Sequence, residues 1–212
     1  LIWSASAGDI VVTGALGGGG NAIQSLTVTS ARNFTTSSTL SVAGDVDLTT
    51  TGVVTLNGGA VGTGVGDSLA IVTDTLVFAT GSLSVTGMLT AAATTSITNG
   101  ASASVAVGGL ADLASANITL GTTATDSLTA GSLTVNSSGA VDARLDSSVT
   151  LSGANSGTSL LLISIGNILD AVGATVSVTN DATLSAGLDV VLADSASNSA
   201  RMMPLSAARS PP

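Results

Sequence analysis

The sequence predicts an all-β chain folded as a single-stranded parallel β-helix, a β-solenoid of about 20–22 residues per coil. Three observations predict this fold. Apolar and polar residues alternate in short runs, Leu, Val, Ile and Thr dominate those runs, and the runs recur at regular intervals. A β-sandwich would need longer strands and more aromatic residues, and only 1% of this chain is aromatic.

The expected strands are three-residue alternations whose first and last residues are apolar and face the interior. In chain order they are residues 26–28, 40–42, 46–48, 54–56, 69–71, 76–78, 83–85, 105–107, 118–120, 133–135, 149–151, 176–178 and 188–190. Their central Ser, Thr, Ala, Val or Asp residues point outward. The Gly and Asn residues between strands suit corners that need positive φ angles.

Two series of apolar residues give the period of the repeat. The first series is Leu26, Val46, Leu69 and Leu89, and the second is Leu83, Val105 and Leu128. Three strands of about seven residues each would fill one such coil. Inward Leu, Val, Ile and Ala side chains would then stack on the same residue types of the next coil.

The chain divides into a β-solenoid rod over residues 1–194 and a C-terminal segment over residues 195–212. The second segment holds all three Pro residues, two of the three Met and two of the four basic residues. It is expected to be an irregular or disordered tail, or a cap that protects the open sheet edge of the last coil.

Composition excludes several classes of function. The chain has no Cys, His, Lys, Glu or Tyr, which excludes disulfide scaffolds, zinc fingers, thiol enzymes and histidine acid–base catalysis. The net charge is −9, and without a basic patch we expect no nucleic-acid partner. The longest apolar run, residues 160–165, is too short for a helical span, so we expect no membrane insertion.

The repeats resemble those of a known group of bacterial exoproteins. Residues 25–29, 43–49 and 52–59 are similar to repeats of filamentous-haemagglutinin-like adhesins and autotransporter passengers, and the resemblance covers most of residues 8–194. It is one of composition and period, so no functional residue is carried over. The resemblance implies secretion to the cell surface, a right-handed β-helix, and a shaft or adhesive role. The missing Cys agrees with passage across an outer membrane.

A few groups could carry chemistry. Asp45 and Asp47 share one strand face and could act as the carboxylate pair of a polysaccharide-acting enzyme, or be a solvated strand pair. Residues 58–69, with Asp67, partly resemble a calcium-binding roll, and the alternative is a flexible corner or loop. We expect no catalytic residue, no metal site and no cofactor, with Ca²⁺ the one ion left open.

Other polar groups have structural and functional interpretations. Asp142, Arg144 and Asp146 could pair on one face, with little effect on stability. Thr clusters at residues 27–29, 49–51, 73–75 and 123–125 would suit ice binding only if they occupied the same position of successive coils. Sequons begin at Asn33, Asn117 and Asn136, and three are expected by chance in a chain of this composition.

The sequence therefore predicts a non-enzymatic structural or adhesive segment of a secreted cell-surface protein or extracellular filament. It would act as a rigid shaft or as a self-assembling subunit, stacked end to end or on neighbouring repeats of a longer chain. A host or surface glycan is a further expected partner. The alternatives are a flat-faced module that binds ice or carbohydrate, and a polysaccharide-acting β-helix enzyme.

Overall fold

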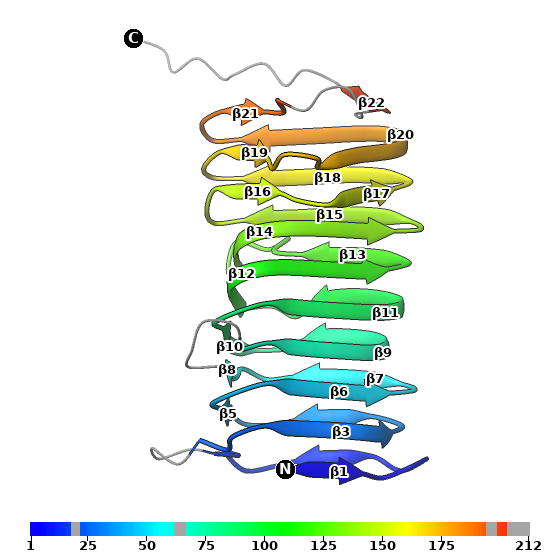
Figure 1. The fold of residues 1–212 in the computed structure, drawn as a ribbon, viewed down its shortest axis with the longest axis vertical. Helices are drawn as coiled ribbons and strands as arrows, with labels where there is room; N and C mark the ends of the chain where they lie inside the picture. Colours follow the sequence, from blue (N-terminus) through cyan, green and yellow to red (C-terminus); the bar gives the residue numbers. More distant parts are fainter. Residues whose placement is uncertain (18–21, 62–66, 194–198, 203–212) are drawn as a thin grey trace.

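The computed structural model describes residues 1–17, 22–61, 67–193 and 199–202, and every element in them is a β-strand. All the strand pairs are parallel, and each strand pairs with strands about one coil away in the sequence. Figure 1 shows the strands stacked along the vertical axis, with β1 at the N-terminal end and β22 at the other. The predicted parallel β-solenoid is therefore confirmed.

One long ladder of strands runs almost the whole length of the rod, and we call it the first ladder. It consists of β1 (Ile2–Ser4), β3 (Leu26–Ala31), β6 (Val46–Thr50), the start of β9 (Leu69–Phe78), the start of β11 (Leu89–Asn99), the end of β12 (Ala103–Ser115), the end of β14 (Ser127–Ser137), β16 (Val149–Leu151), β19 (Ile168–Asp170) and β21 (Val190–Val191).

A second ladder forms another side of the rod. It consists of β2 (Ile10–Val12), β4 (Phe34–Thr36), β7 (Val53–Leu56), the ends of β9 and β11, β13 (Asn117–Leu120), β15 (Ala140–Leu145), β18 (Ser159–Ser164) and the end of β20 (Thr175–Ala186). Because β9 and β11 belong to both ladders, one continuous strand turns the corner between two sides.

A third ladder is confined to the N-terminal two thirds of the rod. It consists of β5 (Leu40–Val42), β8 (Gly59–Val61), β10 (Gly81–Val85) and the starts of β12 and β14. Beyond β14 the described residues add no strand to it. A different ladder begins there, from β17 (Ala154–Gly157) through the start of β20 to β22 (Ser199–Met202).

The length of a coil varies more than the predicted period. Paired residues are 18 positions apart where Leu133 faces Leu151, and 26 apart where Ser4 faces Ser30. Most steps lie between these limits, around the expected value. The change in cross-section beyond β14 accounts for the shortest coils, because the chain no longer builds the third side there.

The core is a set of aliphatic columns that run parallel to the rod axis. The predicted series from Leu26 continues through Ala111 and Leu133 to Leu151, and each member is at most 2% exposed. The second series, Leu83, Val105 and Leu128, also pairs in register. Burying a Leu or Val side chain contributes about 1.5–3 kcal/mol, so these columns supply the main stabilising free energy.

Tight corners depend on glycine where the chain passes close to the next coil. Gly121 has a φ of 70°, and a Cβ at this position would lie 2.2 Å from the backbone oxygen of Arg144. An alanine there would meet both backbone strain and a clash. This glycine therefore lets the corner after β13 pack against the coil that contains β15.

Part of the predicted C-terminal segment, residues 195–212, lies in the described region. Residues 199–202 form β22, in which Asp181 of β20 faces Arg201 and Ala182 faces Met202. The remaining residues of that segment lie outside the described ranges.

Candidate functional surfaces

Asn and Asp side chains at the corners link one coil to the next. Asn33 Oδ1 accepts a hydrogen bond from Val53 N–H at 2.7 Å, one coil later in the chain. The same arrangement recurs at Asn99 with Gly121, at Asn167 with Asp189 and at Asp170 with Ala193. These side chains accept hydrogen bonds from backbone N–H groups that have no partner in the strand ladders because they lie at corners.

The two predicted carboxylates have separate surroundings. Asp45 lies just before β6, and its Oδ1 accepts hydrogen bonds from Ser68 N–H at 2.8 Å and from the Ser68 hydroxyl at 3.0 Å. Asp47 points outward from β6, between Thr27 and Ala70 of the neighbouring coils. Asp45 thus forms part of a corner, while Asp47 lies on an exposed strand surface.

The predicted calcium roll lies only partly in the described region. Residues 62–66 fall outside it, and Asp67 is half-buried at the end of the segment. Gly58 and Gly59 have φ angles of 88° and 144° and pack closely on the backbones of Ser82 and Leu40. The part of the chain that the structure describes contains no cluster of three or more metal-ligating His, Cys, Asp or Glu side chains.

The predicted charge cluster on β15 is partly paired. Arg144 Nε lies 3.4 Å from Asp142 Oδ1, and both side chains are substantially exposed. Asp146 lies just past the end of β15. An exposed pair with this geometry contributes little to stability, so the pair marks no site by itself.

A closer ion pair was missed by the sequence analysis. Arg32 donates from Nε and Nη2 to the two carboxylate oxygens of Asp9 at 2.8 and 2.7 Å, and Asn33 Nδ2 donates to Oδ1 at 2.9 Å. The hydrogen bond from Arg32 holds the pKa of Asp9 below its ordinary value, although desolvation opposes it. The two residues are 23 positions apart, which is one coil, and this spacing was the available signal.

Asp126 organises the corner before β14. Its carboxylate accepts hydrogen bonds from Ser102 N–H at 2.9 Å and from Thr123 N–H at 3.0 Å. Burial alone would raise the pKa of Asp126, but hydrogen bonds from Thr123, Asn99 and Ser102 outweigh it, and the pKa lies below its ordinary value. The ionised form of Asp126 therefore stabilises the fold.

This lowered pKa predicts a pH-dependent contribution to stability. A carboxylate with a depressed native pKa stabilises the fold above its unfolded pKa, near 4, and loses that contribution as the pH falls through the native value. The Asp126→Asn variant should therefore be about 1 kcal/mol less stable at neutral pH. The difference should shrink towards about pH 3. Urea unfolding at both pH values measures it, with Asp146→Asn as the exposed control; an equal difference at both pH values would contradict this role.

The Thr clusters do not form one aligned array. Thr49 faces outward opposite Val72, while Thr50 and Thr73 are buried, with their hydroxyl oxygens 2.8 Å apart. Thr123 and Thr125 lie on an exposed turn. The Thr residues at 27–29, 49–51, 73–75 and 123–125 therefore do not line up as one outward array, although Thr50 and Thr73 are neighbours on adjacent coils.

A different column of outward β-branched residues is aligned on the second ladder. Five successive coils place outward side chains in register there, at Thr35, Thr55, Val77, Thr98 and Thr119. Beside them, on the same strands, a second outward column consists of Val53, Thr75, Ser96 and Asn117. Together they form a two-column array of uncharged side chains, which we call the threonine array.

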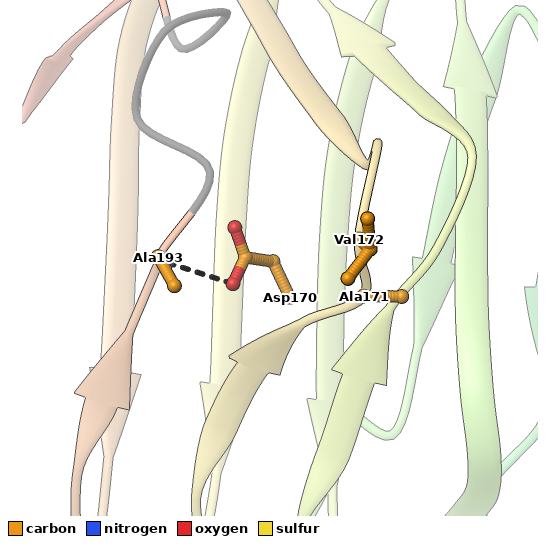
Figure 2. Close-up of a pocket in the computed structure, with 4 residues that line it drawn as sticks. All are labelled: Asp170, Ala171, Val172 and Ala193. Atoms are coloured by element: carbon orange, nitrogen blue, oxygen red, sulfur yellow. Dashed lines mark hydrogen bonds between the residues drawn. The ribbon is translucent and has the colours of Figure 1, made fainter.

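The surface of the described residues includes two depressions relevant to function. A shallow open groove crosses several coils at the corner between the first and second ladders, along Val72, Ala92, Ala114 and Asn136. A smaller hollow near the C-terminal end is lined by Asp170, Ala171, Val172 and Ala193, and Figure 2 shows Asp170 turned towards Ala193, whose N–H it accepts at 2.8 Å. Neither gathers several charged side chains, and Asp170 is occupied in joining two coils.

The three sequon asparagines differ in their contacts. Asn33 is half-buried between Asp9 and Val53, so its side chain already serves the corner. Asn117 and Asn136 are exposed, and Asn136 Oδ1 accepts a hydrogen bond from the Ser156 hydroxyl at 2.6 Å.

Among the residues that the structure describes, no helix is long and apolar enough to cross a membrane. A scan against protein-family models and searches of curated proteins and solved structures found no match to this chain. The geometry of the rod is therefore the basis on which its function is inferred.

Proposed function

We propose that this chain is a non-enzymatic β-solenoid shaft, a rigid structural or adhesive segment of a secreted cell-surface protein or an extracellular filament. The observation that carries the proposal is the uninterrupted first ladder from β1 to β21, in which every coil is bonded to the next. A stack of this kind resists bending because each coil is held by backbone hydrogen bonds and by the buried columns.

The polar side chains also support a structural role. Asp45, Asp126 and Asp170 bind backbone N–H groups at corners, so these carboxylates join coils. The outward positions of the ladders carry Ser, Thr and Ala in large part, giving a surface of low charge density over the rod.

Labelling of intact cells tests this proposal. Antibodies raised against the folded chain should bind to unpermeabilised cells of the source organism, and gold labels should lie away from the envelope. Protease added outside intact cells should remove the label. Labelling that appears only after permeabilisation would contradict an extracellular shaft.

A second candidate function is supported by the threonine array. Its side chains repeat at about 4.8 Å along the rod and about 6.6 Å along each strand. A flat, regular array of this kind can order water into an ice-like layer and so bind an ice surface. Thr55, Thr98 and Thr119 are the members that would contact the ice.

Matched substitutions on one strand test ice binding. Thr98 and Thr90 both lie on β11 and point outward, but Thr98 belongs to the second ladder and Thr90 to the first. If the threonine array binds ice, Thr98→Lys should abolish thermal hysteresis and Thr90→Lys should leave it unchanged. No thermal hysteresis in the unmodified chain would eliminate this candidate and would leave the shaft proposal untouched.

A further inference from the structure

We propose that the groove at the corner between the first and second ladders binds an uncharged glycan, through which the shaft adheres to other surfaces. This inference rests on the adhesive part of the proposed function and deepens it, because it names the class of ligand and the place where it binds. It depends on three observations: the shape of the groove, its uncharged lining, and a buried hydroxyl on its floor that has no hydrogen-bond partner.

The groove runs along the rod axis across four coils in the middle of the rod. One wall consists of outward residues of the first ladder in register, since Ala92 faces Val72, Ala114 faces Ala92 and Asn136 faces Ala114. Three steps at the usual strand spacing give a length of about 14 Å, and the volume is about 510 Å³. These dimensions suit a short extended oligosaccharide that lies across the strands.

Buried corner residues form the floor of this groove. Thr73, Ala93 and Ser115 line it and are at most 8% exposed. The wall on the side of the second ladder carries small side chains, which are Thr94, Ala116 and Ser138. Every lining residue lies between positions 72 and 138, inside the described range 67–193, so the groove is built without either end of the chain.

Ser115 brings an unsatisfied polar group to the floor. Its side chain is 8% exposed, and its Oγ has no hydrogen-bond partner among the described residues. Ser137, which faces it from the next coil, shows what is missing: its Oγ donates to Ala116 O at 2.8 Å and accepts from Gly139 N–H at 3.1 Å. A buried hydroxyl without a partner is unfavourable, and rotation about one side-chain bond lets the Ser115 hydroxyl bond to a ligand in the groove.

The lining selects an uncharged ligand that carries hydroxyl groups. Within the described residues, no charged side chain lines the groove. Its Ser, Thr and Asn side chains both donate and accept hydrogen bonds, as sugar hydroxyls do. Its Ala methyl groups, together with Val72 at 55% exposure, offer apolar contacts to the C–H faces of sugar rings. The net charge of −9 disfavours acidic glycans.

An extended peptide is a poorer match to this groove. A peptide strand binds by adding to a free sheet edge, where its backbone finds unpaired N–H and C=O groups. Here β11 pairs with β9 on one side and with β12 on the other, and β12 pairs in turn with β14; Figure 1 shows these strands stacked in the middle of the rod. The groove therefore offers side chains but no free strand edge, which suits a glycan better than a peptide backbone.

A glycan array probed with the whole chain tests the inference. We expect the 212-residue chain to bind neutral oligosaccharides, with cellotetraose and mannotetraose among those printed, in preference to sialylated ones. Ala114→Leu fills the middle of the groove and should abolish binding in isothermal titration calorimetry. Ala106→Leu is the matched control, because Ala106 is also outward and half-buried on β12 but belongs to the third ladder. It should bind like the unmodified chain.

Ser115→Ala separates ligand binding from stability. Because the Ser115 hydroxyl has no partner in the fold, its removal should not lower the midpoint of urea unfolding, whereas the dissociation constant of the neutral glycan should rise about tenfold. Ser137→Ala should do the reverse, since it removes two hydrogen bonds within the fold. It should lower the midpoint and leave the dissociation constant unchanged. Circular dichroism checks that each variant is folded.

Three outcomes would overturn the inference: no neutral glycan binds, whether or not peptides of a parallel array do; a folded Ala114→Leu variant binds the glycan as before; or Ser115→Ala leaves the dissociation constant unchanged. None of them bears on the extracellular shaft, which depends on the labelling of intact cells. Labelling confined to permeabilised cells would in turn leave the glycan measurements on the purified chain unaffected. The two proposals can therefore fail separately.

Discussion

Replacing Asn155 with alanine is expected to lower the free energy of unfolding by about 3 kcal/mol, which is a large share of the stability of an ordinary domain. The Asn155 side chain is 1% exposed and lies in an otherwise apolar inward position. Its Oδ1 accepts from Val135 N–H at 3.0 Å, and its Nδ2 donates to Ser152 O at 3.1 Å and to Thr175 O at 3.3 Å.

The register explains why a polar residue is needed there. Leu133 faces Leu151, but Asn136 faces Ser156, so the later coil holds two more residues than the earlier one over this stretch. The extra residues remove the backbone oxygen that Val135 N–H would otherwise meet, and Asn155 Oδ1 replaces it. Alanine would leave a buried donor and buried acceptors without partners.

Asn136 provides the matched control for Asn155. It is the same residue type one coil earlier, but it is exposed, and its Oδ1 accepts from the Ser156 hydroxyl. Asn136→Ala should cost less than about 1 kcal/mol in urea unfolding. If the two variants lost the same free energy of unfolding, burial and backbone hydrogen bonding at Asn155 would not be the source of its contribution.

The second large effect is expected at Phe34, one of three aromatic residues in a chain with an aliphatic core. Its side chain is fully buried on β4, between Ile10 and Val54 of the neighbouring coils. Phe34→Ala should cost about 3–5 kcal/mol because it leaves a cavity in a column that has no bulky neighbour to fill it. Chemical unfolding monitored by circular dichroism measures this loss.

The location of the destabilised strands in Phe34→Ala distinguishes a solenoid from a globular domain. Each coil contacts only its neighbours, so faster hydrogen exchange in Phe34→Ala should concentrate in β2, β4 and β7 and leave β18 and β20 unchanged. Phe34→Leu should cost about 1 kcal/mol, since most of the volume remains. Uniformly faster exchange along the whole chain would contradict coil-by-coil stability.

The fold could be predicted from the sequence because the signal is repeated many times. Alternation in the strands placed Leu26, Val46 and Leu69 inward, and their spacing placed them in register, as the structure confirms. An error in predicting one strand has little effect on the predicted fold, because the neighbouring coils show the same pattern of inward and outward residues.

What could not be predicted depends on exact register. The coil length ranges from 18 to 26 residues, so which outward Thr residues align is fixed only by the individual corners. For that reason the sequence indicated the local Thr clusters around Thr50 and Thr73 as candidates for ice binding, whereas the array through Thr55 and Thr98 was not predicted. The role of Asn155 could not be predicted for the same reason. Its side chain is needed as an acceptor for Val135 N–H only because one coil contains two extra residues.

A distance measurement between the ends of the rod tests the shaft most directly. The chain contains no cysteine, so Thr29→Cys on β3 and Val172→Cys beside β19, both at exposed positions, accept two unique spin labels. Seven ladder steps separate β3 from β19, which predicts an axial separation of about 34 Å at the usual strand spacing. A rigid shaft predicts one narrow distance distribution centred near that separation, allowing for the label linkers. A broad distribution, or one centred well below it, would contradict the shaft.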